Sequence, residues 1–349
     1  MGQLSRRGVL QAGVATFVAA AAIPAWAERK GPTAVAVQGE GGRPRLRFTV
    51  PVPTPLDREL QLDLKTHRQL LHLYRKAGAQ AVLAVASTGE MLSISWSEAL
   101  QLTRQASAVF GPMGTWASLS RGISVAACRS GIRQLAQAGA GTAIVVPGLL
   151  ADASVSDAEA LRRLLTVAQG SPLPLGLYEA IAPFHRLLRP ESLQQLAVIG
   201  EYRLLKTTQA SAAVVAAMAG QVPAGFAIYE ANTAELFAVL EAGAAGITDF
   251  CAAAFPELLG YLCQHWGRTG DSAKLQRVCA WMANTDAVLS RQLPFPLSVK
   301  VVLQQRGVPI LPLSRQSVND FNTEQRQQAA DLVQQFEALR VDLGIPSLL

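Results

Sequence analysis

Short strand-like runs and longer helix-like stretches alternate along the chain from residue 45 onward. In the helix-like stretches apolar residues recur at intervals of three and four, which is the spacing of an amphipathic helix. The clearest of them cover residues 60–77, 95–110 and 158–168. Strands are expected at residues 45–52, 79–87, 115–121, 141–147, 174–178, 202–207, 225–229 and 244–248. Eight strands that alternate with helices predict a parallel (β/α)8 barrel.

Residues at the ends of the helical stretches support this assignment. Ser95 precedes Glu98 and Ser156 precedes Glu159, each at the spacing of an N-terminal capping box. Glycines that can adopt the left-handed conformation of a helix C-cap follow three helical runs, at Gly78, Gly139 and Gly243.

The main alternative fold is a doubly wound open sheet. Such a sheet would carry a glycine-rich phosphate-binding turn after its first strand, where this chain has Val-Pro-Thr-Pro-Leu at residues 52–56. We therefore assign residues 45–255 to the barrel. Residues 256–349 are mostly helical in pattern, and we expect them to form a helical extension that packs on the barrel.

The first 27 residues have the pattern of an export signal. The pair Arg6-Arg7 precedes an apolar run over residues 13–23, and the segment closes with Ala25-Trp26-Ala27. This pattern predicts a cleaved signal of the twin-arginine type and a periplasmic location. The alternative is a membrane anchor, but the apolar run is shorter than the roughly 20 residues that a spanning helix needs. Residues 28–44 form a lead rich in glycine and proline.

The composition excludes several classes of protein. Half of the 349 residues are hydrophobic, so a disordered chain is excluded. The net charge of +6 falls to +4 when Arg6 and Arg7 are removed with the signal. Because lysine and arginine do not cluster, we expect no nucleic-acid partner. No stretch after the signal is long and apolar enough to cross a membrane.

The cysteines and histidines do not predict a metal site. None of the four cysteines forms a C-x-x-C pair, and His67 and His72 are too far apart in register to share a helix face. Cys263 and Cys279 could pair after export, but four buried free thiols are the favoured alternative.

Candidate chemistry is sought at the carboxyl ends of the strands, where barrels carry their functional groups. Lys206 ends the sixth strand after the apolar pair Leu204-Leu205. Burial there would favour the neutral amine, which can attack a carbonyl carbon and form a Schiff base. The alternative is a lysine that extends to solvent at the barrel rim. Tyr178 ends the neighbouring strand, where its phenol could transfer protons.

Two further strand ends carry hydroxyl groups. Ser87 and Thr88 form a turn that could hold a carboxylate. Thr248 ends the eighth strand and is a further candidate to bind the substrate. Glu90 could cap this turn or form an internal ion pair, and that structural role is the favoured one for it.

Spaced motifs over residues 50–312 resemble the dihydrodipicolinate synthase / N-acetylneuraminate lyase family of class I aldolases. They are Thr54-Pro55-Leu56-Asp57, Ala86-Ser87-Thr88-Gly89-Glu90, Val145-Val146-Pro147, Leu177-Tyr178, Leu205-Lys206, Gly243-Ala244-Ala245-Gly246-Ile247 and Ser298-Val299-Lys300-Val301-Val302-Leu303. The resemblance implies that Lys206 forms the Schiff base with a 2-oxo acid and that Tyr178 transfers protons. It further implies that Ser87 and Thr88 bind the substrate carboxylate, that no metal or organic cofactor takes part, and that the chain forms dimers or tetramers.

Several positions depart from the family pattern. Gly148 and Leu149 stand where two aromatic residues are usual, so the tyrosine of the synthases' proton relay is missing. The carboxylate-binding arginine of the synthases is also missing, and Arg186 is the candidate to replace it. Ala231 stands where a glycine is expected and could crowd the substrate.

The sequence therefore predicts an exported Schiff-base lyase or aldolase that acts on pyruvate or a related 2-oxo acid, with sugar-acid derivatives as one class. A true dihydrodipicolinate synthase is not expected, since lysine biosynthesis is a cytoplasmic task. The alternative is a barrel that has lost turnover and binds a small molecule or a partner in the periplasm. The missing tyrosine and Ala231 favour this alternative, whereas the retention of both Lys206 and Tyr178 argues against it.

Overall fold

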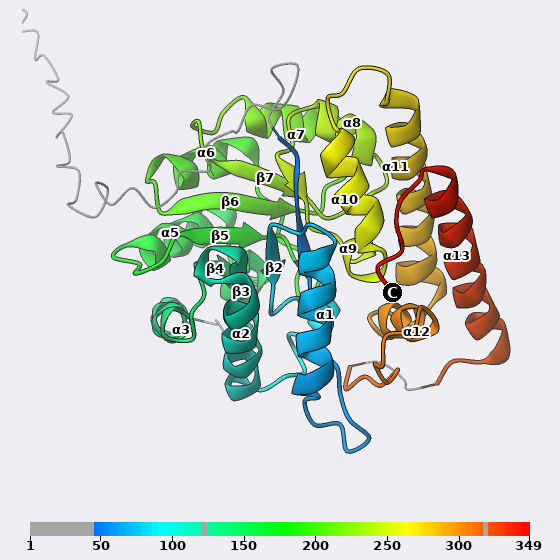
Figure 1. Cartoon of the computed structure of the whole chain (residues 1–349). Coiled ribbons are helices and arrows are strands. Elements are labelled where there is room, and N and C mark those ends of the chain that lie inside the picture. The colour runs from blue at the N-terminus through cyan, green and yellow to red at the C-terminus, as the bar shows by residue number, and fades with distance from the viewer. Residues whose placement is uncertain (1–44, 121–123, 317–319) are drawn as a thin grey trace, which may run out of the picture. The chain divides into compact units, whose positions relative to one another are not determined.

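Eight parallel strands close into a barrel in chain order, which confirms the predicted (β/α)8 architecture (Figure 1). The computed structural model describes residues 45–120, 124–316 and 320–349. The strands are β1 (Arg47–Pro51), β2 (Ala81–Leu83), β3 (Thr115–Ser118), β4 (Thr142–Val145), β5 (Leu175–Tyr178), β6 (Tyr202–Thr207), β7 (Ala227–Glu230) and β8 (Gly246–Ile247). The predicted export signal and the lead that follows it lie outside the described residues.

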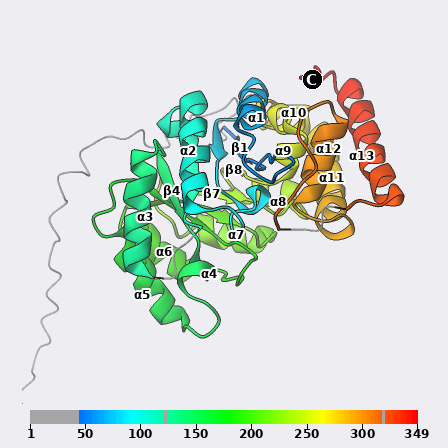
Figure 2. The same ribbon diagram turned by 90° about the horizontal axis from the view of Figure 1, so that it is seen from below.

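Helices surround the strands, as the view from below shows (Figure 2). Those that follow the strands are α1 (Leu64–Lys76), α2 (Trp96–Phe110), α3 (Val125–Gln137), α4 (Pro147–Leu150), α5 (Asp157–Ala168), α6 (Pro190–Val198), α7 (Ala212–Ala219), α8 (Leu236–Glu241) and α9 (Cys251–Ala254). The extension contains α10 (Pro256–His265), α11 (Ser272–Ala287), α12 (Leu297–Gln305) and α13 (Thr323–Asp342). Helix α10 packs on β1, and α12 packs between α9 and α13.

Most strands are shorter than the sequence predicted, and two element bounds differ by four residues. Strand β2 stops at Leu83, and Ser87–Gly89 forms a 3₁₀ turn that ends at Glu90 in the left-handed region, with φ 60°. The turn packs closely against the segment after β1. A Cβ added at Gly89 would come within 2.6 Å of the Val52 carbonyl oxygen, so there is no room for a side chain at this position. Helix α1 begins at Leu64 instead of residue 60, because the Asp63 side chain accepts the N–H of Thr66 and caps the helix.

The predicted helix caps are present with one difference. Ser95 and Glu98 form the complete capping box at the start of α2. Ser156 caps α5, but the Glu159 carboxylate pairs with Arg162 and Arg163 instead of closing the box. The glycines that follow α1, α3 and α8 have the expected positive φ, with values of 89°, 89° and 110° for Gly78, Gly139 and Gly243.

The strand register identifies which side chains point into the barrel. Paired residues of neighbouring parallel strands point to the same side of the sheet. Lys206 pairs with Tyr178 on β5 and with Tyr229 on β7, so these three side chains share one side. The ring of Tyr229 meets that of Trp116, from β3 across the barrel, edge to face at 5.0 Å, so this side is the barrel interior.

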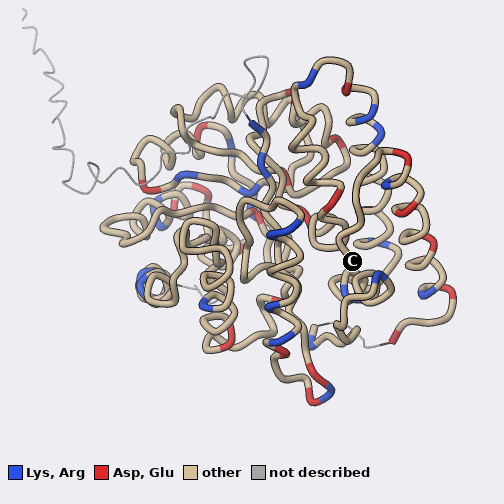
Figure 3. The backbone as a smooth tube through the Cα atoms, in the orientation of Figure 1, with Lys and Arg blue, Asp and Glu red and all other residues tan. Residues whose placement is uncertain are grey.

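Basic and acidic residues are interspersed over the described part of the chain (Figure 3). All four cysteines are free, so Cys263 and Cys279 are not paired in this structure. Within the residues that the structure describes, no helix has the length and apolar character needed to span a membrane.

Candidate active site

The predicted nucleophile and the predicted proton-transfer group lie side by side. Lys206 on β6 and Tyr178 on β5 are register partners on neighbouring strands. Both side chains point into the barrel, and each residue is only 5% exposed to solvent. The Lys206 Nζ lies 4.1 Å from the centroid of the Tyr178 ring, over its face. A cation in this position is stabilised by the ring, and a neutral amine there is shielded from water. The alternative of a lysine that extends into solvent is wrong for Lys206.

The Ser87–Gly89 turn after β2 contacts Tyr178. The Ser87 Oγ lies 3.0 Å from the Tyr178 hydroxyl, within hydrogen-bond distance. Thr88 follows it and is buried. Three of the predicted residues, from β5, β6 and the β2 turn, therefore meet in one group, which we call the Lys206–Tyr178–Ser87 group.

Thr248 lies on the inner side of the barrel as well. It stands two residues after Gly246, which pairs with Tyr229, and strand alternation places its side chain on the side of Lys206. Its buried Oγ1 has no hydrogen-bond partner among the described residues, and the same holds for the Oγ atoms of Ser118 and Ser120 on β3 and just after it. Buried hydroxyl groups are usually paired, so these oxygens can hold a ligand or water.

Arg186 is already engaged by the protein. The side chain is 7% exposed and pins the segment between β5 and α6 to the segment that precedes α5. Its guanidinium donates to the carbonyl oxygens of Ala151, Asp152 and Val155 and to the Asp157 carboxylate, at 2.6–2.9 Å. Among the described residues no hydrogen bond joins Arg186 to the Lys206–Tyr178–Ser87 group. With at least four of its N–H contacts already used, the structure gives no support to a substrate-binding role for Arg186.

The segment after β4 leaves no room for an aromatic residue at position 148. A Cβ on Gly148 would lie 1.9 Å from the carbonyl oxygen of Phe184, far inside any allowed contact. Leu149, at the second position of the missing aromatic pair, is half-buried against the core. Backbone packing against Phe184 therefore requires glycine at position 148, where the family pattern has an aromatic residue.

Ala231 follows β7 on the inner side of the barrel, two residues after Tyr229. Its backbone N–H donates to the Thr207 carbonyl and to the Glu230 carboxyl, which fixes the start of the turn. The side chain adds a single methyl group at the level of the barrel mouth.

A group of buried carboxyl groups was not assigned a role by the sequence analysis. Glu179, Glu230 and Asp249 stand at or just after the ends of β5, β7 and β8, with exposures of at most 1%. Glu230 alternates with the inward Tyr229, so it points toward the surrounding helices. Glu179 accepts hydrogen bonds from the backbone of Leu188 and the side chain of Thr207.

Burial controls the ionisation of these acids. It raises the pKa of Glu230 to about 8, and the nearby negative charges of Glu179 and Asp249 add to the rise. Burial also raises the pKa of Asp249, as does the charge of Asp286 on α11, while the positive charge of Lys206 opposes that rise. In the sequence, only their position at the ends of strands marks these acids as candidates for the site. Their pKa values depend on neighbours that are distant in the sequence. Among the described residues no group of three or more histidine, cysteine or acidic side chains is arranged to hold a metal ion.

The fold and this geometry define a (β/α)8 barrel with a buried lysine on the sixth strand and a tyrosine beside it on the fifth. The chain matches the sequence profile described as "Dihydrodipicolinate synthetase family" over residues 45–336. It therefore belongs to the dihydrodipicolinate synthetase family.

One curated protein is similar to the chain in sequence, and solved structures are similar to it in fold. A 4-hydroxy-tetrahydrodipicolinate synthase from Exiguobacterium sp. is 25% identical over 263 residues, which cover 73% of this chain and 88% of that protein. The crystal structure of YagE from E. coli K12, a dihydrodipicolinic acid synthase family protein in complex with pyruvate, superposes with a TM-score of 0.75 at 22% identity, covering 84% of this chain and 98% of YagE. Dihydrodipicolinate synthase from Bacillus anthracis superposes with a TM-score of 0.76 at 17% identity, covering 83% and 98%.

Proposed function

We propose that this protein is a Schiff-base-forming lyase or aldolase that acts on pyruvate or a related 2-oxo acid. The observation that carries the proposal is the Lys206–Tyr178–Ser87 group, in which a buried amine lies over the ring of a phenol that contacts a serine hydroxyl. Membership of the family supports it, as does the pyruvate complex of YagE.

The chemistry begins with the neutral amine of Lys206. Its lone pair attacks C2 of the oxo acid, and the loss of a proton from the nitrogen together with the gain of a proton by the carbonyl oxygen gives a neutral carbinolamine. Loss of that hydroxyl as water, with a second proton, leaves the iminium. Tyr178 is placed to supply and recover these protons, and the Ser87 hydroxyl at 3.0 Å can pass them on. The iminium then accepts the electron pair that is released when a bond at the adjacent carbon breaks.

The substrate carboxylate is assigned to the turn that carries Ser87 and Thr88. Thr248, with its unpaired hydroxyl on the inner side of the barrel, supplies a further hydrogen-bonding group for the remainder of the substrate. Because Arg186 is engaged elsewhere, this remainder is expected to bind through hydroxyl groups more than through an arginine–carboxylate pair. Sugar-acid derivatives have this character.

We propose a second substrate other than that of the 4-hydroxy-tetrahydrodipicolinate synthase from Exiguobacterium sp.. The support is that position 148 excludes any side chain and that Leu149 offers no phenol for a relay. Export through a twin-arginine signal and assembly into a dimer or tetramer remain predictions from the sequence and the resemblance.

A ligand-binding barrel without turnover is the second candidate. It is favoured by the same loss of the relay tyrosine and by the unpaired hydroxyls of Ser118, Ser120 and Thr248, which suit a bound polar molecule. It predicts binding that stabilises the protein without a covalent bond to Lys206.

One experiment separates the two candidates. The protein is incubated with each member of a panel of 2-oxo acids, reduced with borohydride, and its intact mass is recorded beside its thermal shift. We expect a reduced adduct in the wild type and in the exposed control Lys65→Arg, and none in Lys206→Arg. Stabilisation by an oxo acid without any adduct would reject the enzyme in favour of the binding protein.

A further inference from the structure

The turn that carries Ser87 and Thr88 is held by a buried ion pair with the C-terminal extension. Glu90 ends the turn and is 1% exposed, and its Oε1 lies 2.6 Å from Nζ of the fully buried Lys300 on α12. Lys300 also donates to the Leu313 carbonyl oxygen at 2.6 Å. The pair joins residues that are 210 positions apart.

The second oxygen of Glu90 binds the segment that follows α12. Its Oε2 accepts the Ser314 hydroxyl at 2.9 Å and the Arg315 backbone N–H at 2.7 Å. The Gln316 N–H adds a third contact to Oε2 at 3.2 Å. Oε1 therefore binds α12 through Lys300, and Oε2 holds the segment after α12 against the turn. We call Glu90, Lys300, Ser314 and the Arg315 backbone the Glu90 network.

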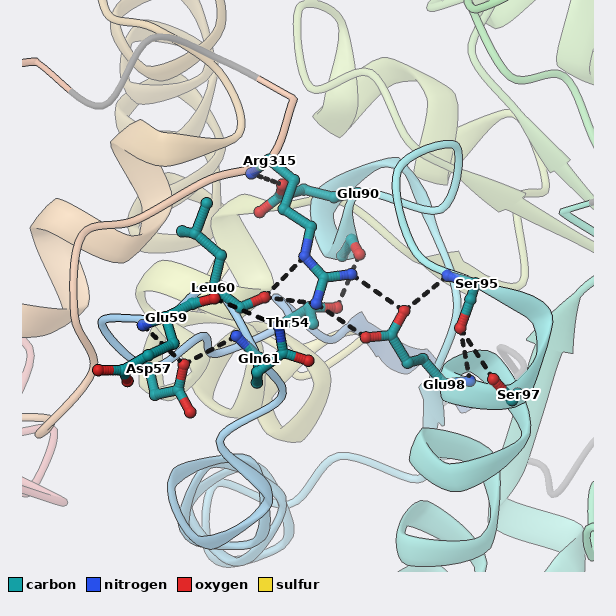
Figure 4. A network of polar contacts seen from close by, with 11 residues as sticks. Thr54, Asp57, Glu59, Leu60, Gln61, Glu90, Ser95, Ser97, Glu98 and Arg315 are labelled. Atoms are coloured by element: carbon teal, nitrogen blue, oxygen red, sulfur yellow. Dashed lines mark hydrogen bonds and ion pairs between the residues drawn. The ribbon is translucent and has the colours of Figure 1, made fainter.

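A separate ion pair lies beside this network (Figure 4). The Arg315 guanidinium forms a two-pronged pair with Glu98, at 2.8 and 3.0 Å, and donates to the Leu60 carbonyl oxygen. Glu98 closes the capping box of α2 and does not contact the turn of Ser87 and Thr88. It therefore offers a matched comparison, since it also anchors the extension but is not part of the turn.

A continuous chain of hydrogen bonds and one cation–π contact connects the Glu90 network to the nucleophile. The Glu90 N–H donates to the Ser87 carbonyl at 3.0 Å, and the Thr54 hydroxyl donates to the Gly89 carbonyl at 2.7 Å. Ser87 contacts the Tyr178 hydroxyl at 3.0 Å, and the ring of Tyr178 lies under Lys206. A shift of the turn would move the hydroxyl that orients the phenol.

We propose that Glu90 is a positioning residue for Schiff-base formation, which sets the orientation of the Tyr178 phenol and of the carboxylate-binding turn through its ion pair with Lys300. The inference rests on the proposed function. It makes the C-terminal extension part of the active unit, because the barrel alone supplies neither Lys300 nor the backbone donors of residues 314–316. A displacement of the reacting groups by about 1 Å can cost about 100-fold in rate.

A single substitution of Glu90 or Lys300 would not distinguish a role in positioning the active site from a role in folding. Removal of one partner leaves the other as an uncompensated buried charge, which is strongly destabilising, whereas neutralising both removes this penalty. The test variant is therefore the double substitution Glu90→Gln with Lys300→Met. The control is Glu98→Gln, which weakens the neighbouring anchor of the same segment.

The measurement is the first-order rate at which pyruvate, or the oxo acid that labels best, is trapped on Lys206 at saturating concentration, with thermal unfolding recorded in parallel. We expect the double variant to remain folded and to be labelled at least about tenfold more slowly, and Glu98→Gln to be labelled at the wild-type rate. Glu90→Asp, which keeps the charge, should recover part of the rate.

Four outcomes overturn the inference. A folded double variant that is labelled as fast as the wild type shows that Glu90 serves folding alone, and so does an equal loss of rate in Glu98→Gln. Absence of an adduct in the wild type rejects the proposed function and the inference with it. Should the double variant fail to fold, Ser314→Ala removes one contact to Glu90 without a change of charge, and an unchanged labelling rate in that variant also overturns the inference.

Discussion

Replacement of Tyr178 by phenylalanine is expected to slow imine formation at Lys206 by about 100-fold or more, with little change in stability. The phenylalanine ring retains the packing over the amine, at 4.1 Å from Nζ in the native protein, but loses the hydroxyl that contacts Ser87. Dehydration of the carbinolamine then depends on water, which has little access to a lysine that is 5% exposed. Borohydride quenching at successive times after addition of the oxo acid gives the rate.

Tyr229→Phe is the matched control for this prediction. Tyr229 is the other strand neighbour of Lys206, but its ring packs on Trp116, and burial raises the pKa of its phenol to about 12. A group with so high a pKa is a poor proton donor at neutral pH, so the rate should stay near that of the wild type. Equal rates in Tyr178→Phe and the wild type would remove Tyr178 from the mechanism.

Gly148→Ala is expected to destabilise the protein by about 1–3 kcal/mol, the usual cost of forced overpacking. The new Cβ would lie 1.9 Å from a backbone oxygen, that of Phe184, so relief requires the segment between β5 and α6 to move. Equilibrium urea denaturation measures the loss. Because the same segment follows directly after Tyr178, we also expect a lower rate of adduct formation.

The control for this prediction is a glycine with room for a methyl group. A Cβ at Gly220 would meet its nearest neighbour at 3.4 Å, so Gly220→Ala should change the free energy of unfolding by less than about 1 kcal/mol. Wild-type stability of Gly148→Ala would mean that this position could accommodate a larger residue. Backbone packing at position 148 would then no longer disfavour a synthase-like relay.

The sequence predicted the parts of the fold and the site that depend on local pattern. Alternating hydrophobic stretches gave the strand order, and strand-end position together with the apolar Leu204-Leu205 pair identified Lys206. Tyr178 could be placed beside it because consecutive strands in a (β/α)8 barrel are neighbours. The register pair between these two residues follows from that arrangement.

The parts that the sequence could not predict depend on contacts between distant residues. The sequence around Arg186 does not indicate that its guanidinium donates hydrogen bonds to residues 151–157. The sequence predicts that Glu90 caps its turn or forms an internal ion pair, but it does not identify Lys300, 210 positions away, as the partner. The pKa of Glu230 likewise depends on burial and on acids from two other strand ends.

The lysine that carries the covalent bond decides whether Lys206 is the nucleophile. After reduction in the presence of the best oxo acid, the protein is digested and each of its six lysines is assigned by peptide mass spectrometry. We expect a stoichiometric adduct on Lys206 and none on the other five lysines. An adduct on a different lysine, or cleavage of an oxo-acid substrate with Lys206 unmodified, would contradict this expectation.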